Sequence, residues 1–415
     1  MSKIRVKNFG PIKEGYLEND GWIDLKKVTI FIGNQGSGKS TLAKVISTLL
    51  WMEKALNRKE ITVQTIHDFQ LHFSYQNIKS YFNENTLIEY EGDCYRISYD
   101  LKKNQFPKIE ESNQTDYKVP KIIYIPAERN ILSVIKSANG VKGLPEPLFD
   151  FAEELKTVQL ETKGEDIQLP INGVSYRYDI ATESSFIIGE NYQENLLRSS
   201  SGFQSFVPLF LVSRSRSAQI QKGSKLSSAN ISVNQSIRMN EEISRIMLLT
   251  EHSPEIKDDL VKKIQKRFIN SCLINIVEEP EQNLFPSSQK MILNSLLEFN
   301  NSNKDNKLII TTHSPYFINY LTLAVEAWKL KAITKNQRLL EKIYDIVPKE
   351  SHVLASELVI YELDERNGSI DKLESFDDLP SDENKLNEKL GEGNELFAQL
   401  LEIKQLIKHD ITHQS

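Results

Sequence analysis

Residues 33–40 read Gly33-Asn34-Gln35-Gly36-Ser37-Gly38-Lys39-Ser40, and Thr41 follows directly. They match the pattern G-x-x-x-x-G-K-[ST], whose glycines let the backbone fold so that successive N–H groups point at one phosphate. Residues 28–32 are apolar and β-branched like a buried strand, and residues 42–56 repeat apolar side chains at helical spacing. This order of strand, loop and helix distinguishes a phosphate-binding loop from a glycine-rich turn with an unrelated lysine. Lys39 would reach the β- and γ-phosphates, and Ser40 would be a ligand of Mg²⁺.

Composition limits the class of protein. A chain of 415 residues can hold two or three domains, or one large α/β core with insertions. Its formal net charge of −6 argues against a surface coated in nucleic acid, so that any contact with DNA would be a local patch. The two cysteines have no metal or disulfide spacing, and no run of about 18 apolar residues occurs. We therefore expect a cytoplasmic protein that is neither secreted nor membrane-spanning.

A second apolar run, residues 272–277, predicts an interior strand that ends in Glu278-Glu279-Pro280-Glu281. Carboxylates at the end of such a strand hold Mg²⁺ and orient water in P-loop proteins. Two adjacent carboxylates are also costly unless a cation lies near them. We assign Glu278 to the magnesium ion and Glu279 to the attacking water.

Two further strands end in polar residues. Residues 307–312 predict a strand that delivers His313 to the same edge, where it would contact a γ-phosphate instead of serving as a structural histidine. Residues 121–125 predict another strand, followed by Glu128 and Arg129. These two residues are site candidates, and the alternative is a solvated loop.

Ser200, Ser201 and Gly202 lead into the apolar run 206–212 and therefore open a predicted helix. Small hydroxyl residues and a glycine at this position can offer backbone N–H groups and a hydroxyl to an anion. A serine-rich helix N-cap without any ligand would have the same sequence.

The polar stretch 213–235 predicts a mobile loop, in which Arg214, Arg216, Lys222 and Lys225 are either solvated or in contact with a phosphate backbone. Two helices are expected between residues 240 and 269, broken at Ser253-Pro254. A hairpin is expected over residues 357–373, turning at Asn367-Gly368, and an amphipathic helix over residues 394–407.

Taken in order along the chain, these segments resemble the ABC-type ATPases, and most of all their SMC-like and OLD-like branch. The resemblance is carried by Asn8-Phe9-Gly10-Pro11-Ile12, the phosphate loop, Glu278-Glu279-Pro280-Glu281 with Leu284 and Pro286, and Thr311-Thr312-His313-Ser314-Pro315. It implies an α/β fold, a P-loop NTPase with an ABC-type ATPase head, an accessory antiparallel β layer and helical insertions.

The resemblance also implies a domain organisation. Residues 1–130 would form the first part of the ATPase core, with the phosphate loop and the antiparallel β layer. A lid-like insertion would occupy residues 131–190, the signature segment 191–212, and a mobile loop with a helical insertion 213–270. Residues 271–320 would complete the core with the acidic strand and the His element, and residues 321–415 would form C-terminal helices and a hairpin.

A head-to-tail homodimer that encloses two ATP molecules is implied as well, with a higher oligomer left open. Each site would take residues of one subunit that bind the nucleotide, hold Mg²⁺ or act in hydrolysis: Gly33, Asn34, Gly36, Ser37, Gly38, Lys39, Ser40, Thr41, Glu278, Glu279 and His313. The other subunit would supply Ser200, Ser201 and Gly202. Since hydrolysis removes the γ-phosphate that joins the subunits, the nucleotide state would determine the quaternary state.

The sequence departs from the family pattern at several points. The signature reads Ser199-Ser200-Ser201-Gly202-Phe203 where Leu-Ser-Gly-Gly-Gln is usual, and Glu278 stands where Asp is usual, as in OLD-like proteins. No Gln-loop glutamine is evident, and the stretch near Glu128 would replace it. There are no sustained heptads for a long SMC arm, and the roughly 100 residues after His313 contain no Asp-x-Asp pair for a TOPRIM nuclease.

An ATPase head without arm or nuclease resembles the ATPase subunits of bacterial anti-phage systems, which control a separate effector such as a nuclease or toxin. The principal alternative is a DNA-repair-type ATPase that grips DNA with the basic residues around Arg214–Lys225. A transporter's ATP-binding subunit would need a membrane partner. A small-molecule P-loop kinase would need neither the Ser200–Gly202 segment nor His313.

Overall fold

The computed structural model describes residues 2–62, 66–104, 106–112, 117–133, 135, 143–222, 233–248 and 254–413. A seven-stranded sheet organises them, in the order β2-β16-β15-β4-β14-β13-β8. Its strands are β2 (Gly15–Tyr16), β4 (Val28–Gly33), β8 (Pro120–Ile125), β13 (Cys272–Glu278), β14 (Lys307–Thr312), β15 (Leu358–Leu363) and β16 (Ser369–Lys372). The five strands from β15 to β8 are mutually parallel. Their carboxyl ends therefore meet at one edge, which is where the predicted site residues follow β4, β8, β13 and β14.

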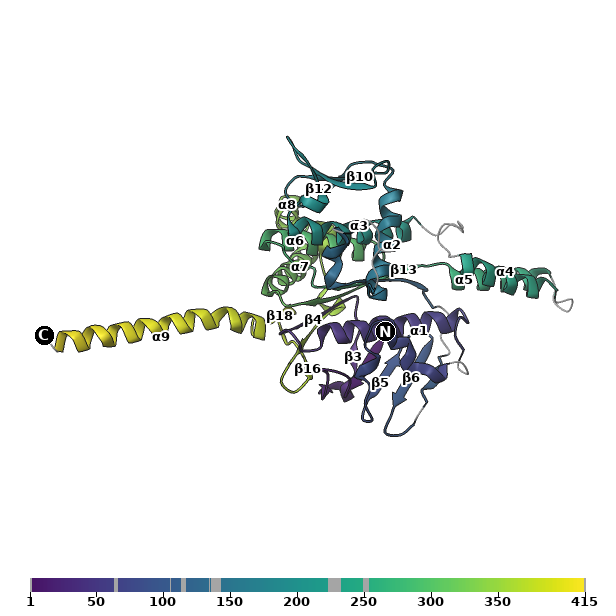
Figure 1. Ribbon diagram of the computed structural model, residues 1–415, viewed down its shortest axis with the longest axis horizontal. Coiled ribbons are helices and arrows are strands. Elements are labelled where there is room, and N and C mark those ends of the chain that lie inside the picture. The colour runs from purple at the N-terminus through teal and green to yellow at the C-terminus, as the bar shows by residue number, and fades with distance from the viewer. Residues whose placement is uncertain are drawn as a thin grey trace.

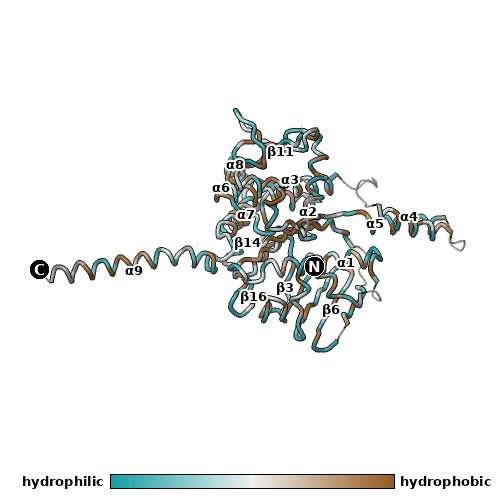
Figure 2. Tube along the Cα trace, in the orientation of Figure 1, coloured by the Kyte–Doolittle hydropathy of each residue, from teal (hydrophilic) through white to brown (hydrophobic). Residues whose placement is uncertain are grey.

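Each face of this sheet is covered by its own hydrophobic core, which explains why the interior strands read as continuous apolar runs. On one face lie Phe31, Ile276 and Ile309 with the helix α1 (Lys39–Asn57). The opposite face is covered by four helices: α2 (Glu146–Glu161), α3 (Ser201–Gln221), α6 (Pro286–Asn301) and α7 (Pro315–Ile333). Figure 1 shows this layered arrangement, and Figure 2 shows hydrophobic residues gathered along the central strands.

The accessory antiparallel layer expected from the sequence is present. It has five strands in the order β3-β1-β5-β6-β7 and packs against α1 in the same core. The strands are β1 (Lys3–Lys7), β3 (Ile23–Asp24), β5 (Leu87–Glu91), β6 (Tyr95–Asp100) and β7 (Lys108–Glu111). The expected α/β fold with an antiparallel layer and helical insertions is therefore confirmed.

The segment between β8 and α3 contains α2 and a small antiparallel sheet. This sheet has the order β12-β11-β10-β9, with β9 (Ile167–Gln168), β10 (Ser175–Asp179), β11 (Ser184–Ile188) and β12 (Gln193–Asn195). Tyr176, Tyr178 and Ile187 are buried in the same core as α2 and α3. The segment expected as a lid is thus packed onto the sheet's helical layer.

The loop was expected to start at residue 213, but residues up to Gln221 belong to α3. Composition was misleading here since the polar residues of this helix have partners. Ser217 donates its hydroxyl to the Phe299 carbonyl oxygen, 3.0 Å away, and Arg216 is ion-paired. Residues 223–232, which contain the rest of the expected loop and Lys225, lie outside the described residues.

Two helices follow, as predicted, and they project from the body of the molecule in Figure 1: α4 (Val233–Leu248) and α5 (Pro254–Phe268). They contact each other, and Arg267 of α5 forms an ion pair of 2.7 Å with Glu242 of α4.

The C-terminal part is less separate than the predicted boundary at residue 321 implied. After α8 (Gln337–Ile346), strand β15 enters the central sheet directly beside β4, and β16 completes the predicted hairpin. A second hairpin, β17 (Ser375–Phe376) and β18 (Leu379–Pro380), precedes α9 (Lys385–His413). This last helix starts earlier than expected because it continues through Gly391 and Gly393, and it extends far from the core in Figure 1.

Short 3-10 helices connect several elements: η1 (Asn19–Gly21), η2 (Ile66–Ser74), η3 (Lys79–Tyr81), η4 (Ala127–Ser133), η6 (Leu196–Arg198), η8 (Lys349–Ser351) and η9 (Ala355–Glu357). Within the part of the chain that the structure describes, no helix combines the length and the hydrophobicity needed to cross a membrane.

Candidate functional site

The phosphate loop joins β4 to α1 with the backbone geometry that its glycines permit. Gly33, Gly36 and Gly38 all have positive φ angles, of 142°, 75° and 102°. A Cβ atom on Gly33 would also lie 2.4 Å from the Leu363 carbonyl oxygen. Only glycine satisfies both conditions at this position.

Lys39 is the first residue of α1 and is almost completely buried. Its ammonium group donates to the carbonyl oxygens of Gly33 and Asn34, at 2.8 and 2.7 Å. Burial lowers the pKa of Lys39, and the charges of Glu279, Glu281 and other nearby carboxylates oppose this shift. The lysine is therefore held across the loop, in reach of the acidic residues.

Glu278, the last residue of β13, is only 4% exposed. Burial raises the pKa of its carboxyl group, while an interaction with the Ser40 side chain opposes the shift. The two residues assigned to Mg²⁺ therefore lie together. Mg²⁺ binds through one or two protein oxygen ligands together with phosphate oxygens, and this hydroxyl–carboxylate pair fits that requirement.

Glu279 and His313 meet at the same edge. Glu279 has a positive φ of 43°, and its backbone N–H donates to the Thr311 carbonyl oxygen at 2.8 Å. Its Oε1 atom is 3.7 Å from Nδ1 of His313. Unlike Glu278, both side chains are partly exposed, so that they can contact a ligand bound from solvent.

Glu281 has a role that the sequence did not indicate. It is 5% exposed, and its Oε1 accepts hydrogen bonds from the Thr312 hydroxyl at 2.7 Å and the His313 backbone N–H at 2.9 Å. Nδ1 of His313 is 3.6 Å from the same oxygen, and burial raises the pKa of the Glu281 carboxyl group. Glu281 thus positions His313. Its only signal in the sequence is a third carboxylate in the acidic turn.

Arg129, in η4, is completely buried and holds the acidic turn from behind. Its guanidinium donates to the carbonyl oxygens of Glu278 at 2.7 Å, Glu279 at 2.6 Å and Pro126 at 3.1 Å. Its Nε donates to the Ser205 carbonyl oxygen in α3 at 3.0 Å. Burial lowers the pKa of Arg129 to about 10. Glu128, its neighbour, is exposed, as in the solvated-loop alternative.

The predicted signature residues lie at the start of α3. Ser200 caps the helix, Ser201 is its first residue, and both are exposed. Gly202 packs against the acidic segment, since a Cβ on it would lie 2.9 Å from the Asn283 carbonyl oxygen. Among the described hydrogen bonds and ion pairs, none joins these three residues to residues 33–41.

A second unforeseen residue, Glu365, reaches the loop from the hairpin between β15 and β16. Its Oε1 accepts a hydrogen bond from the Asn34 side-chain amide at 3.1 Å. The two residues are separated by 331 positions in the sequence, so that no local pattern could have indicated the contact.

One of the basic residues considered for DNA is not available at the surface. Arg216 is buried and pairs with Glu154 and, at 2.9 Å, with Glu161. Arg214, within α3, and Lys222, directly after it, are exposed. Arg216 is therefore engaged in ion pairs inside the protein and is not available to contact DNA as part of the proposed basic patch.

Comparison with known proteins gives one family match. Residues 142–318, less than half of the chain, match the family described as the AAA ATPase domain. This stretch contains the signature segment, the acidic turn and His313. No curated protein sequence matches the chain.

Several solved structures are similar at low identity. The SMC head bound to the C-winged helix domain of ScpA has a TM-score of 0.39 and 12% identity, covering 89% of this chain and 95% of that chain. The SMC head domain from Thermotoga maritima has a TM-score of 0.35 and 10% identity, covering 90% and 98%. The ATP-binding cassette MJ0796, in a dimeric post-hydrolysis state with ADP and Pi, has a TM-score of 0.27 and 12% identity, covering 91% and 100%.

The strand–loop–helix arrangement of residues 28–57 and the carboxylates at the end of β13 are found together with a family match over residues 142–318. The chain therefore has the fold of a P-loop ATPase.

Proposed function

We propose that this chain binds and hydrolyses ATP as an ABC-type ATPase of the SMC-like branch, and that it works as a dimeric, nucleotide-dependent switch. The observation that carries the proposal is the meeting of Lys39, Glu278, Glu279 and His313 at one sheet edge. Nδ1 of His313 is 3.7 Å from Oε1 of Glu279. The negative charges of Glu279 and Glu278 both oppose the lowering of the pKa of Lys39 by burial.

Each side chain has a separate task in this proposal. Lys39 now donates to two loop carbonyl oxygens, and it would donate to phosphate oxygens instead when a nucleotide enters. The partly exposed carboxylate of Glu279 orients the attacking water, and His313, oriented by Glu281, contacts the γ-phosphate. With Ser40 and Glu278 as its ligands, bound Mg²⁺ would neutralise part of the phosphate charge.

The dimer follows from the position of the signature residues. Ser200 and Ser201 are exposed at the N-terminus of a helix of 21 residues, and no hydrogen bond described within the chain engages their hydroxyl groups. A helix N-terminus of this kind favours an anion. The partner's γ-phosphate is the anion we propose, so that ATP joins two subunits and hydrolysis releases them.

The switch would control a separate effector protein, a nuclease or toxin, that acts in anti-phage defence. We assign the response to phage to this partner by analogy with defence ATPases of similar layout.

The test uses the full-length chain and Glu279→Gln, with Glu128→Gln as the matched control because Glu128 is exposed and near the same edge. We expect the wild type and Glu128→Gln to hydrolyse ATP with Mg²⁺ present. We expect Glu279→Gln to lose hydrolysis and to form a stable dimer only with ATP, as measured by analytical ultracentrifugation. Absence of hydrolysis in the wild type, together with a monomeric Glu279→Gln in ATP, would refute the proposal.

The effector is tested separately, by coexpressing the chain with proteins encoded beside it. A partner retained by Glu279→Gln with ATP and released without nucleotide supports the switch. Equal retention in both states contradicts nucleotide control but leaves the ATPase assignment intact.

A further inference from the structure

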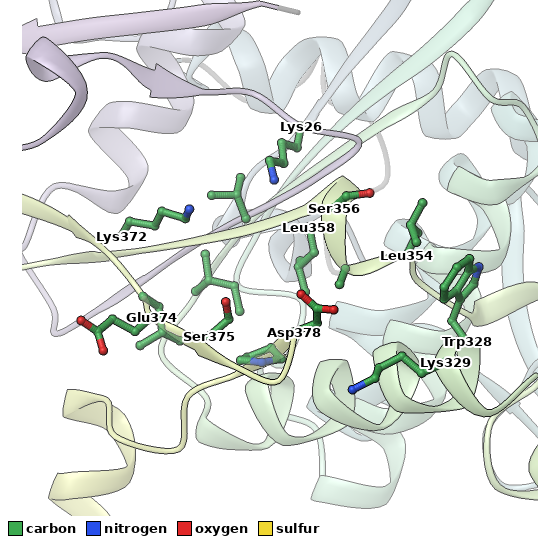
Figure 3. Close-up of a pocket in the computed structure, with 15 residues that line it drawn as sticks. Lys26, Trp328, Lys329, Leu354, Ser356, Leu358, Lys372, Glu374, Ser375 and Asp378 are labelled. Atoms are coloured by element: carbon green, nitrogen blue, oxygen red, sulfur yellow. The ribbon is translucent and has the colours of Figure 1, made fainter. Parts of the chain in front are cut away.

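A cavity of about 320 Å³ opens between α7 and the strands β15 and β16, on the side where β15 begins. Its walls come from segments distant in the sequence, as Figure 3 shows. The lining includes Lys26, Trp328, Leu358, Lys372 and Asp378. The volume lies at the small end of the range of about 300–1,000 Å³ for small-molecule sites.

Two ammonium groups face this cavity. Lys26, just before β4, is partly buried, and Lys372 is the last residue of β16. In the described part of the structure, no hydrogen bond or ion pair engages either ammonium group. Lys329 on the same wall differs, because it is bound to Asp377 at 2.8 Å.

The two unpaired lysines also affect each other. Burial lowers the pKa of Lys26, the positive charge of Lys372 lowers it further, and the negative charge of Asp24 opposes the shift. A lysine pair of this kind gains from an anion placed between the two charges. A phosphate monoester carries about −1.5 to −2 charges at neutral pH, which matches two ammonium groups.

The rest of the cavity suits an organic body attached to that anion. In Figure 3 the Asp378 carboxylate points toward the cavity, whereas that of Glu374 points away from it. Asp378 can therefore accept hydrogen bonds from hydroxyl or amino groups of a ligand. Trp328 lies on the side away from the two lysines and offers an aromatic surface, and Leu358 adds an apolar wall.

We propose that this cavity binds a phosphorylated small molecule of about mononucleotide size. Lys26 and Lys372 hold its phosphate, Asp378 accepts from its hydroxyl or amino groups, and Trp328 contacts its ring. This site is separate from the phosphate loop and does not depend on the ATPase function.

The separation follows from the register of the sheet. Leu358 pairs with Val28 beside the cavity, whereas Leu363, at the other end of β15, pairs with Gly33 of the phosphate loop. The cavity thus lies toward the edge opposite the ATP site. A substitution in the loop can remove binding there and leave this cavity intact.

The test is isothermal titration calorimetry of uridine 5′-monophosphate into the full-length chain carrying Lys39→Ala. We expect saturable binding with one site per chain. Adding Lys26→Ala and Lys372→Ala together should weaken it about tenfold or more, equivalent to about 1.4 kcal/mol. The matched control is Lys27→Ala, which removes a neighbouring lysine that pairs with Glu357 at 3.7 Å and should leave affinity within about twofold.

Two further titrations test the phosphate-binding and ring-binding parts of the site separately. Inorganic phosphate should bind more weakly than uridine 5′-monophosphate and should lose affinity with the lysine substitutions. Trp328→Ala should weaken the binding of uridine 5′-monophosphate but not the binding of inorganic phosphate. Thermal melting of each variant confirms that it is folded. The proposal is overturned if neither probe binds at about 10 mM, or if the double lysine variant binds the nucleotide as tightly as its parent.

Discussion

Arg129→Met tests whether one buried guanidinium holds the acidic turn in place. Methionine has similar length and no donors, so that the change removes all four hydrogen bonds to carbonyl oxygens of Pro126, Ser205, Glu278 and Glu279. It also removes a buried positive charge. The turn is a sensitive target because Glu279 has a φ of 43°, a conformation that a residue other than glycine adopts at a cost.

The magnitude follows from the four hydrogen bonds that are lost. The carbonyl oxygens of Pro126 and Glu279 keep a backbone donor, from the N–H groups of Arg129 and Gln282, so the loss is that of the bonds and not of every donor. Taking about 1 kcal/mol for each of the four bonds, and allowing for the relief of removing a buried charge, gives about 2–4 kcal/mol of lost stability. At about 2 °C per kcal/mol for a chain of this size, the melting temperature should fall by about 4–8 °C.

The assay is thermal melting without nucleotide, followed by ATP hydrolysis at a temperature where the variant is folded. Arg214→Met is the matched control because Arg214 is exposed on α3, and exposed substitutions change stability by about 0.5 kcal/mol or less. We expect Arg129→Met to lose hydrolysis more than tenfold through misplacement of Glu279. A melting temperature equal to that of Arg214→Met would refute the assigned role of Arg129.

Two other substitutions probe neighbouring parts of the site. Gly33→Ala should abolish nucleotide binding in calorimetry and lower the melting temperature, because its Cβ would lie 2.4 Å from the Leu363 carbonyl oxygen at a φ of 142°; unchanged ATP binding would contradict this account. Glu281→Gln keeps an oxygen that can accept from Thr312 and His313 but removes the buried charge. Burial raises the pKa of Glu281 above 4.5, so that the wild type loses stability as the pH rises from about 4.5 through the folded-state pKa. The variant should lose this part of the pH dependence and melt higher at neutral pH, and a lower melting temperature across the whole pH range would disprove it.

The sequence predicted the parallel strands well because they are buried on both faces. Strands covered on both sides need continuous apolar runs, and such runs are visible at residues 28–32, 121–125, 272–277 and 307–312. Since parallel strands share the direction of their carboxyl ends, it also predicted that Glu279 and His313 would meet. Their distance of 3.7 Å agrees with that expectation.

Contacts between segments that are distant in the sequence could not be predicted from local patterns. The hairpin at residues 357–373 was recognised, but nothing local indicated that β15 would join β4 or that Glu365 would contact Asn34. Polarity was misleading for a related reason. The stretch 213–221 has the composition of a loop, and it is helical because Arg216 finds Glu154 and Glu161 on α2. Composition shows that a side chain is polar, but it does not show whether the fold provides a hydrogen-bond or ion-pair partner for it.

The contacts of Arg129 give a physical reason for one chain to coordinate two nucleotide sites. In the proposed dimer, the acidic turn serves the chain's own ATP, whereas the start of α3 serves the ATP of its partner. The same guanidinium binds the carbonyl oxygens of Glu279 in the turn and Ser205 in α3. Asn283 makes a second link, donating its side-chain amide to the Ser205 hydroxyl at 3.1 Å. Because these links are short and wholly or partly buried, a displacement of the turn on loss of the γ-phosphate must move or strain α3, and hydrolysis at one site would then loosen the other.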